Sequence, residues 1–447
     1  MSAPRIGWSP TCLFDKQLCL DRLEAESVDL TVQPAAPDKA PAQAINLPAL
    51  DLPLAVTIGS VDMGPLTFNQ QAVWDRFRFS ASGSGAAWSI SRLSVQREDL
   101  ALAVSGRLET RGDWPLDLAV QAELPPPEGD QWLLDLILTG SVADLRLSGT
   151  SQGYLNARVS GGVEPLQPAL PARLRLRTPS FKATGTLPET LTLRDTEINV
   201  DGSLANGFRV GGKGQLAGTQ GDIGLALTGL VTTTGARNLD LRLTGRGTGD
   251  AETGSVSVQG KMSWQQALTL EADLALDAFA WFNLVPDLEP PPVVLNRLNG
   301  KVSYRDGQYS ATLAAVVDGP QGRTDLASKI DGDLKSVDLS DLRINTGAGF
   351  LSGQAQVGFA GPLTWQTSLA LSQFNPGYWL PALEASLNGE VTSSGTVPLG
   401  EEPRQGGSPE GKPSIQAAWD LAGSWRTSDA GIRGRLDQSG DTLVLAD

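Results

Sequence analysis

The pentapeptide LNGKV at residues 298–302 recurs as LNGEV at residues 387–391, 89 residues further along the chain from Leu298 to Leu387. Each copy follows a segment with two alternate leucines and a phenylalanine, namely Leu274, Leu276 and Phe279, then Leu369, Leu371 and Phe374. In both copies apolar and polar residues alternate with a period of two, which is typical of a strand with one apolar face. Such a module cannot bury its apolar face alone and must add to its neighbours. The repeat therefore predicts a long, continuous β-structure rather than an enzyme with one pocket.

The composition is that of an all-β protein with frequent turns and an acidic surface. The 447 residues include 50 Gly, well above the average share of about 7%, and 29 Pro, while helix-forming runs are few. Turn signals separate the alternating segments every 8 to 14 residues or so, which favours an antiparallel meander over βαβ units. The formal charge is −15, with 35 Lys and Arg against 50 Asp and Glu. Such a charge argues against nucleic acid as a partner and against adsorption to anionic lipid surfaces.

The chain has no histidine, and this restricts its chemistry. Ser/His/Asp and Cys/His nucleophile systems, imidazole general bases and His-bearing metal sites are all excluded. Carboxylate-only chemistry, as in glycosidases, remains possible in principle, but no paired Asp and Glu signature stands out. The sequence therefore predicts a protein that is not an enzyme and that has no cofactor and no metal.

The two cysteines lie close together at Cys12 and Cys19. A disulfide between them would suit an oxidising compartment and would add about 2–3 kcal/mol by closing a short loop. The alternative is two reduced thiols in the core. We favour the disulfide, because an isolated pair lacks the two further ligands that a metal site needs.

Composition divides the chain into five segments. We expect an N-terminal β segment with the cysteine pair at 1–33, a Pro/Ala linker or loop at 34–46, continuous β repeats at 47–400, a polar Gly/Pro-rich loop at 401–413, and a further β segment at 414–447. No run of about 18 apolar residues is present, and the first residues do not form a signal peptide. The final residues stop within a predicted strand, so we interpret the chain as a piece of a longer protein.

Strict alternation predicts a sheet with one apolar face, but it does not indicate what covers that face. The apolar face could be sealed in a sandwich, wound in a β-helix or left open as a groove. Four stretches bear on this question: residues 8–30 with the cysteine pair, residues 102–120, residues 260–276, and the repeated connections that lead to LNG. In these stretches, and in their order, the chain resembles the TamB family of AsmA-like proteins.

The resemblance implies an elongated β-taco, a long, curved, mostly antiparallel sheet folded lengthwise around an apolar groove. It implies a bridge-like lipid-transfer protein that carries phospholipids between the inner and outer membranes. It also implies a periplasmic location, an inner-membrane anchor in the full-length protein, and a partner, the outer-membrane barrel TamA. The anchor and the TamA-binding region are expected outside this chain.

If the groove exists, the period-two pattern indicates which side chains line it. The predicted lining is Leu102, Val104, Leu116, Leu118, Leu134, Leu136, Leu239, Leu241, Leu243, Val256, Val258, Leu268, Leu270, Leu369 and Leu371. The alternative is that these residues form an ordinary dry core. A β-bulge would reverse the face of every residue that follows it in the strand. Each lining residue is therefore assigned only by its odd or even position along an uninterrupted strand.

Two other functions are open. The chain could be a scaffold that assists the assembly of outer-membrane β-barrel proteins or autotransporters together with TamA, through exposed sheet edges. It could also be a β-helix that acts on glycans, but the strands lack a steady coil-length repeat and no carboxylate cluster is evident. Lipid transfer is the interpretation that we favour.

Overall fold

The computed structural model describes residues 4–31, 45–129, 131–246, 252–286, 288, 291, 293–319, 322–347, 349–378, 384–397, 414–425, 428–439 and 442–446. Strands dominate, and the only helices in these residues are short 3-10 turns. An open, mixed sheet contains 27 strands, and a second sheet contains three. The predicted all-β class is confirmed. Among the described residues, no helix has the length and apolar character needed to cross a membrane.

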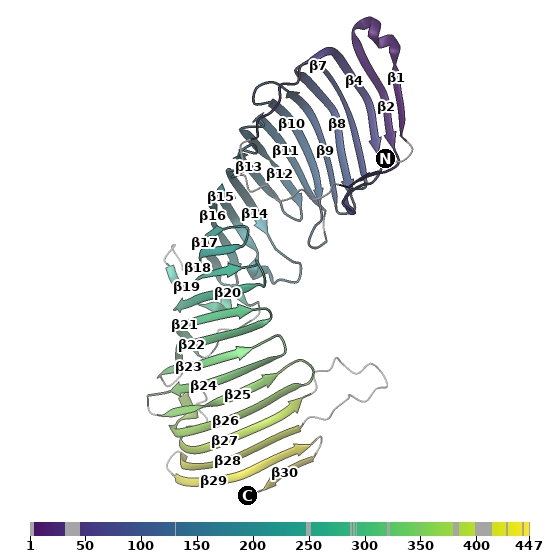
Figure 1. Cartoon of the computed structure of the whole chain (residues 1–447). Coiled ribbons are helices and arrows are strands. Elements are labelled where there is room, and N and C mark those ends of the chain that lie inside the picture. Colours follow the sequence, from purple (N-terminus) through teal and green to yellow (C-terminus); the bar gives the residue numbers. More distant parts are fainter. Residues whose placement is uncertain are drawn as a thin grey trace. The chain divides into compact units, whose positions relative to one another are not determined.

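The chain divides into two compact units, which Figure 1 shows in purple to teal and in green to yellow. Unit 1 is Met1–Leu216 together with Leu230–Thr233, and unit 2 is Ala217–Gly229 together with Thr234–Asp447. The segments predicted from composition stay predictions. Two of them, the linker at 34–46 and the polar loop at 401–413, lie outside the described residues except for residues 45 and 46.

Unit 1 is a ladder of strands that pair with their neighbours in chain order. The first pair, β1 with β2, is antiparallel, β2 pairs with β4 in parallel, and each later pair from β4–β7 to β15–β16 is antiparallel. The strands of this ladder are β1 (Arg5–Ser9), β2 (Gln17–Ala25), β4 (Leu52–Met63), β7 (Arg76–Gly85), β8 (Ala87–Arg97), β9 (Leu100–Glu109), β10 (Pro115–Leu124), β11 (Trp132–Ser141), β12 (Leu145–Gly153), β13 (Ala157–Val163), β14 (Ala172–Phe181), β15 (Leu193–Ser203) and β16 (Gly207–Gly218).

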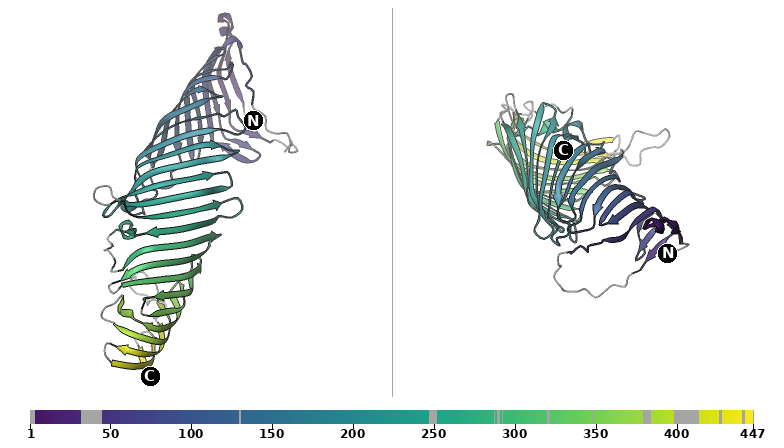
Figure 2. Two further views of the ribbon diagram at one scale, coloured as in Figure 1. Left: turned by 90° about the vertical axis from the view of Figure 1, so that its left-hand side faces the viewer. Right: turned by 90° about the horizontal axis from the view of Figure 1, so that it is seen from above.

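Unit 2 is also a ladder of strands, and all of its described strand pairs are antiparallel. Each strand from β18 to β30 is antiparallel to the next, and Figure 2 shows these strands side by side. The strands are β17 (Gly221–Val231), β18 (Gly235–Arg246), β19 (Glu252–Ser263), β20 (Thr269–Asp277), β21 (Val294–Arg305), β22 (Gln308–Gly319), β23 (Gly322–Gly332), β24 (Ser336–Asn345), β25 (Phe350–Gly358), β26 (Leu363–Phe374), β27 (Ala385–Val397), β28 (Ser414–Trp425), β29 (Ser428–Ser439) and β30 (Thr442–Ala446).

The sequence repeat corresponds to two equivalent strand pairs. The first copy of LNG lies on β21, which pairs with β20, and the second lies on β27, which pairs with β26. The phenylalanines that end the leading segments, Phe279 and Phe374, are both buried. The connections differ, with the 3-10 helices η3 (Trp281–Leu284) and η4 (Pro376–Tyr378) following the two phenylalanines. The module is therefore a strand pair closed by a buried aromatic side chain.

Tight turns hold many of the strand pairs in register. Between β21 and β22 the chain turns at Asp306 and Gly307, and both residues have positive φ angles, 49° and 89°. This is the Asp-Gly pattern of a two-residue hairpin, in which glycine adopts the left-handed conformation without steric cost. Short turns of this kind let one strand follow another with little intervening chain.

A small cluster of side chains lies beside the first strands of unit 1. The second sheet consists of β3 (Val28–Leu30), β5 (Leu66–Phe68) and β6 (Gln71–Trp74). Val28 and Leu66 are buried there together with Ala25, and Met63 and Trp74 pack against them. Two further 3-10 helices, η1 (Pro10–Asp15) and η2 (Glu189–Leu191), complete the elements of unit 1.

Candidate functional site

Apolar side chains form an unbroken row across unit 1. The backbone pairing places one residue from each of thirteen consecutive ladder strands, β1 to β16, directly opposite the next. The row, called the unit 1 row, is Ile6, Leu23, Val61, Phe79, Leu93, Val104, Val120, Leu136, Gly149, Val159, Leu176, Ile198 and Gly212. It contains no charged or polar side chain.

Unit 2 carries a row of the same kind. Twelve consecutive strands, β18 to β29, each contribute one residue. The row, called the unit 2 row, is Leu243, Val256, Leu276, Leu298, Ala315, Leu326, Ile344, Leu351, Leu371, Gly389, Leu421 and Ile432. This row is also free of charged and polar side chains.

The apolar face is only partly shielded from solvent. Among the described residues, sixteen apolar side chains are buried, and six of those are alanine. The Leu and Val side chains of the rows are mostly half-buried. A sealed core would bury these side chains more completely.

Fourteen of the fifteen predicted lining residues are half-buried, and they lie in or beside the two rows. Five are members of the rows: Val104, Leu136, Leu243, Val256 and Leu371. The remaining nine half-buried residues lie on the same strands, in parallel rows: Leu102, Leu116, Leu118, Leu134, Leu239, Leu241, Val258, Leu270 and Leu369.

Leu268 is placed differently from the other predicted lining residues. It precedes β20 and is 47% exposed. The chain bends before this strand begins, so the period-two alternation does not extend back to Leu268.

Several members of the rows were missed by sequence reasoning. Val61, Phe79 and Leu93 continue the face of Val104, but irregular pairing between Ile58 and Val61 and between Ile90 and Leu93 shifts the parity in that region. Alternation alone would place Ile58 and Val61 on opposite faces. In the sequence, the only indication for Val61 was its apolar side chain. Its face follows from its pairing with Phe79 on the neighbouring strand.

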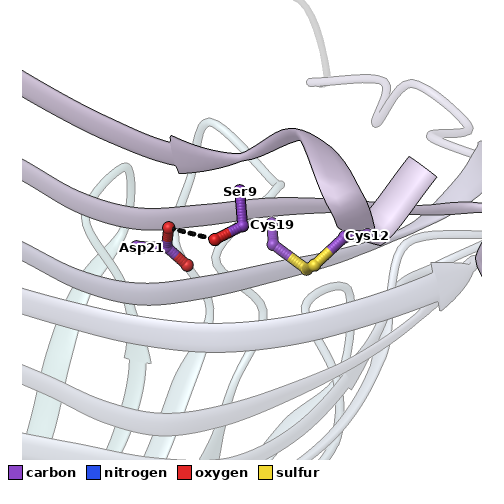
Figure 3. Close-up of a disulfide and its surroundings, with 4 residues drawn as sticks. All are labelled: Ser9, Cys12, Cys19 and Asp21. Atoms are coloured by element: carbon purple, nitrogen blue, oxygen red, sulfur yellow. Dashed lines mark hydrogen bonds between the residues drawn. A yellow bond between two sulfur atoms is a disulfide. The ribbon is translucent and has the colours of Figure 1, made fainter. Parts of the chain in front are cut away.

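The N-terminal hairpin ends in a turn that the predicted disulfide closes. Cys12 lies in η1 and Cys19 on β2, and their sulfur atoms are bonded (Figure 3). Beside the bond, Ser9 Oγ donates to Asp21 Oδ2 at 2.6 Å, which ties β1 to β2. The backbone N–H of Lys16 donates to the carbonyl of Leu13 at 3.1 Å and ends the turn. The loop is thus held by a covalent bond and two hydrogen bonds.

Comparison with known families identifies the family to which the chain belongs. The family model for the TamB N-terminal domain matches residues 35–308 and 292–445, which together cover most of the chain. The chain belongs to the TamB family. The family predicted from the four sequence stretches is therefore confirmed.

One relative of this TamB-family chain is the translocation and assembly module subunit TamB of Haemophilus influenzae. It is 30% identical over 142 residues, which are 29% of this chain and 10% of the relative. The chain thus matches only a small part of that protein's length. No solved structure matches the chain.

The opposite face of this TamB-family sheet is polar and carries ion pairs. On β14, Arg173, Arg175 and Arg177 alternate with inward Leu174 and Leu176. Arg173 Nε lies 2.7 Å from an oxygen of Asp201 on the next strand. The two faces of a single strand are therefore chemically distinct.

Glu197 on β15 is the acidic centre of this polar face. Hydrogen bonds from Asn199, Arg177 and Arg175 favour its charged form and lower the pKa of its carboxyl to about 2. The nearest donor atoms are Arg175 Nη2 at 2.8 Å and Arg177 Nε at 2.9 Å. This arrangement shares one carboxylate between two of the arginines on β14 and does not contribute to the apolar face.

Proposed function

We propose that this chain binds phospholipid acyl chains along its apolar face and passes them between the inner and outer membranes, with no catalytic step. The observation that carries the proposal is the pair of uncharged apolar rows, most of whose side chains are half-buried, although Val61, Val120, Leu276 and Leu351 are buried. Membership of the TamB family supports it. In this proposal the chain lies in the periplasm, and the sheet curves around the lipid as a groove.

The energetics of lipid movement fit an unbroken apolar row. Exposing an acyl chain to water costs about 0.8 kcal/mol per CH₂, or on the order of 12 kcal/mol for sixteen carbons. A path for lipids must offset this cost at every step. A row without charged groups gives nearly even burial from strand to strand, whereas one inward charge would add a local barrier of roughly several kcal/mol.

Each row is long compared with a lipid. Thirteen strands spaced about 4.8 Å apart give the unit 1 row a length on the order of 60 Å, and the twelve strands of the unit 2 row give about 50 Å. A single acyl chain would occupy only part of either row. Each unit could therefore hold several lipids, with their head groups in water at the open side of the sheet, and no head-group pocket is required.

In this proposal, the protein partner and the membrane anchor involve regions other than this chain. The relative's name describes a subunit of a translocation and assembly module, which supports a role beside an outer-membrane partner such as TamA. We propose that regions beyond this chain contact TamA and anchor the full-length protein in the inner membrane. The net charge of −15 argues against nucleic acid as a partner.

Native mass spectrometry with lipid extraction tests the proposal on the 447-residue chain expressed into the periplasm. We expect several co-purified phospholipids per chain. Leu241→Asp places a charge on the apolar face next to Val258 and should lower the lipid count several-fold. The matched control is Arg242→Asp, which places the same residue on the exposed polar face one position along β18 and should leave the count unchanged. A folded wild-type chain without lipid would overturn the proposal.

The second candidate function is a scaffold for the assembly of outer-membrane β-barrel proteins. The words "translocation and assembly" in the relative's name favour it, as does the edge strand β1, for which the described residues show one partner, β2. An edge of this kind can accept an added strand. Binding of an unfolded β-barrel chain by lipid-free protein would support the scaffold over lipid transfer.

A further inference from the structure

The most exposed large apolar side chain among the described residues lies at the tip of the first hairpin. Phe14 is 90% exposed, and Trp8, Leu13 and Leu18 of the same hairpin are also exposed. The tip, residues 8–18, consists of the end of β1, the helix η1 and the start of β2. Surface hydrophobic residues that occur singly need no explanation, but four within the eleven residues of one hairpin tip indicate an interaction surface.

The tip is constrained although it is exposed. Pro10 begins η1, the Cys12–Cys19 disulfide closes the turn, and Lys16 ends it in the left-handed conformation with a φ of 58°. The apolar side chains therefore project from a fixed loop, which loses little further conformational freedom when they are buried. A fixed display of this kind is suited to binding.

The chemistry of the tip fits a lipid bilayer. Phenylalanine and leucine bury favourably among acyl chains, tryptophan is enriched at the membrane interface, and a lysine beside them can extend its ammonium group to the head groups. The only charged residues of the tip are Asp15 and Lys16, so it carries no net charge. A convex loop without net charge inserts through apolar contact rather than through attraction to anionic lipids.

The tip is continuous with the apolar face of unit 1. Trp8 pairs with Leu20, and on β1 it shares a face with Ile6, the first residue of the unit 1 row. Leu18 and Leu20 on β2 lie opposite Val56 and Ile58 on β4. Apolar side chains thus extend without a charged interruption from the tip to the beginning of the row.

We propose that the tip inserts into the interface of a phospholipid bilayer, with Phe14 as its main anchor. Insertion places the first strands of unit 1 beside the acyl chains of the bilayer. That consequence, the loading of lipid from the membrane, rests on the proposed function, whereas insertion itself does not.

Flotation of the oxidised 447-residue chain with phosphatidylcholine vesicles tests the inference. We expect binding that persists at high salt. Phe14→Ser should weaken the partition onto vesicles by about tenfold, because one buried aromatic side chain is lost. Phe14→Leu should largely retain binding. The matched control is Leu334→Ser, which removes a side chain that is 83% exposed in a turn of unit 2 and should not change binding.

Three results would overturn the inference: no binding by the wild type, equal binding by wild type and Phe14→Ser, or binding that requires anionic lipid and disappears at high salt. The last result would instead point to the arginines of the polar face. Lipid extraction from the same samples separates the two proposals. A wild type that binds vesicles through Phe14 but holds no lipid would contradict only the proposed function.

Discussion

The two faces of strand β11 each carry apolar residues, but these residues differ in their surroundings. Leu136 and Ile137 are neighbours in sequence, yet Leu136 is half-buried while Ile137 is 54% exposed. Leu136 lies between Val120 and Gly149 on the adjoining strands, whereas Ile137 lies between Ala119 and Ser148. The comparison teaches that the apolar face is defined by rows across strands. Ile137, which lies outside such a row, stays on the surface.

The two faces also differ in what holds them. The polar face of unit 1 is connected by ion pairs, such as Arg173 with Asp201, whose side chains are more than half exposed. Exposed pairs of this kind contribute little to stability, because water and salt screen them. Backbone ladders and the apolar rows must therefore supply most of the stability of each unit.

A charge on the apolar face should produce the largest difference between the two sides of β11. We expect Leu136→Asp to stay folded and to lose lipid transfer between donor and acceptor vesicles nearly completely, because the charge interrupts the unit 1 row. Ile137→Asp introduces the same residue on the other face and should transfer lipid at the wild-type rate. Transfer is measured with a fluorescent phospholipid, and folding by circular dichroism.

The same pair of variants distinguishes an accessible face from a dry core. If the row were a sealed core, Leu136→Asp would unfold unit 1 as a whole, since a buried unpaired charge is strongly destabilising. Global unfolding of Leu136→Asp would thus contradict an accessible apolar face.

A larger side chain should also have different effects on the two faces, and these effects should be smaller than those of an added charge. A Cβ at Gly149, in the unit 1 row, would overlap the backbone carbonyl oxygen of Asp135. We expect Gly149→Val to lower the free energy of unfolding by about 1–3 kcal/mol, as overpacking does. Ser148→Val, on the polar face beside Ile137, should change it by less than about 0.5 kcal/mol. Urea denaturation measures both, and equal losses would show that the faces are packed alike.

The smallest effect should come from the ion pairs of the polar face. The pKa of Glu197 falls from 4.5 to about 2 in the folded chain, so its contribution to stability is present above pH 4.5 and is lost as the pH falls toward 2. Wild type should therefore melt slightly above Glu197→Gln at pH 7, and the difference in Tm should shrink in acid. A difference in Tm that is constant between pH 7 and pH 2.5 would contradict this assignment.

Period-two alternation predicted the all-β class and indicated which residues of a regular strand share a face. It indicated the side of Val104, Leu136 and Leu371, because regular pairing preserves parity from one strand to the next. It could not place Leu93 or Val61, because irregular pairing between strands depends on the partner strand and not on the local sequence. Leu268 was included because alternation does not reveal where a strand begins. The division into two units had no compositional signal.

The exposed tip was also beyond the reach of sequence patterns. The spacing of Cys12 and Cys19 suggested a closed loop, but a run such as Leu13-Phe14 in a short turn reads equally well as a buried anchor. Only the structure shows that Phe14 projects into solvent.

Photo-crosslinking from β11 in intact cells tests the central claim most directly. A photoreactive amino acid placed at Leu136, or in parallel at Ile137, reports which face of the same strand contacts lipid. The proposed function predicts phospholipid adducts at Leu136, identified by mass spectrometry, and none at Ile137. Adducts at neither position, or at both equally, would contradict the assignment of the apolar rows as the path of the lipid.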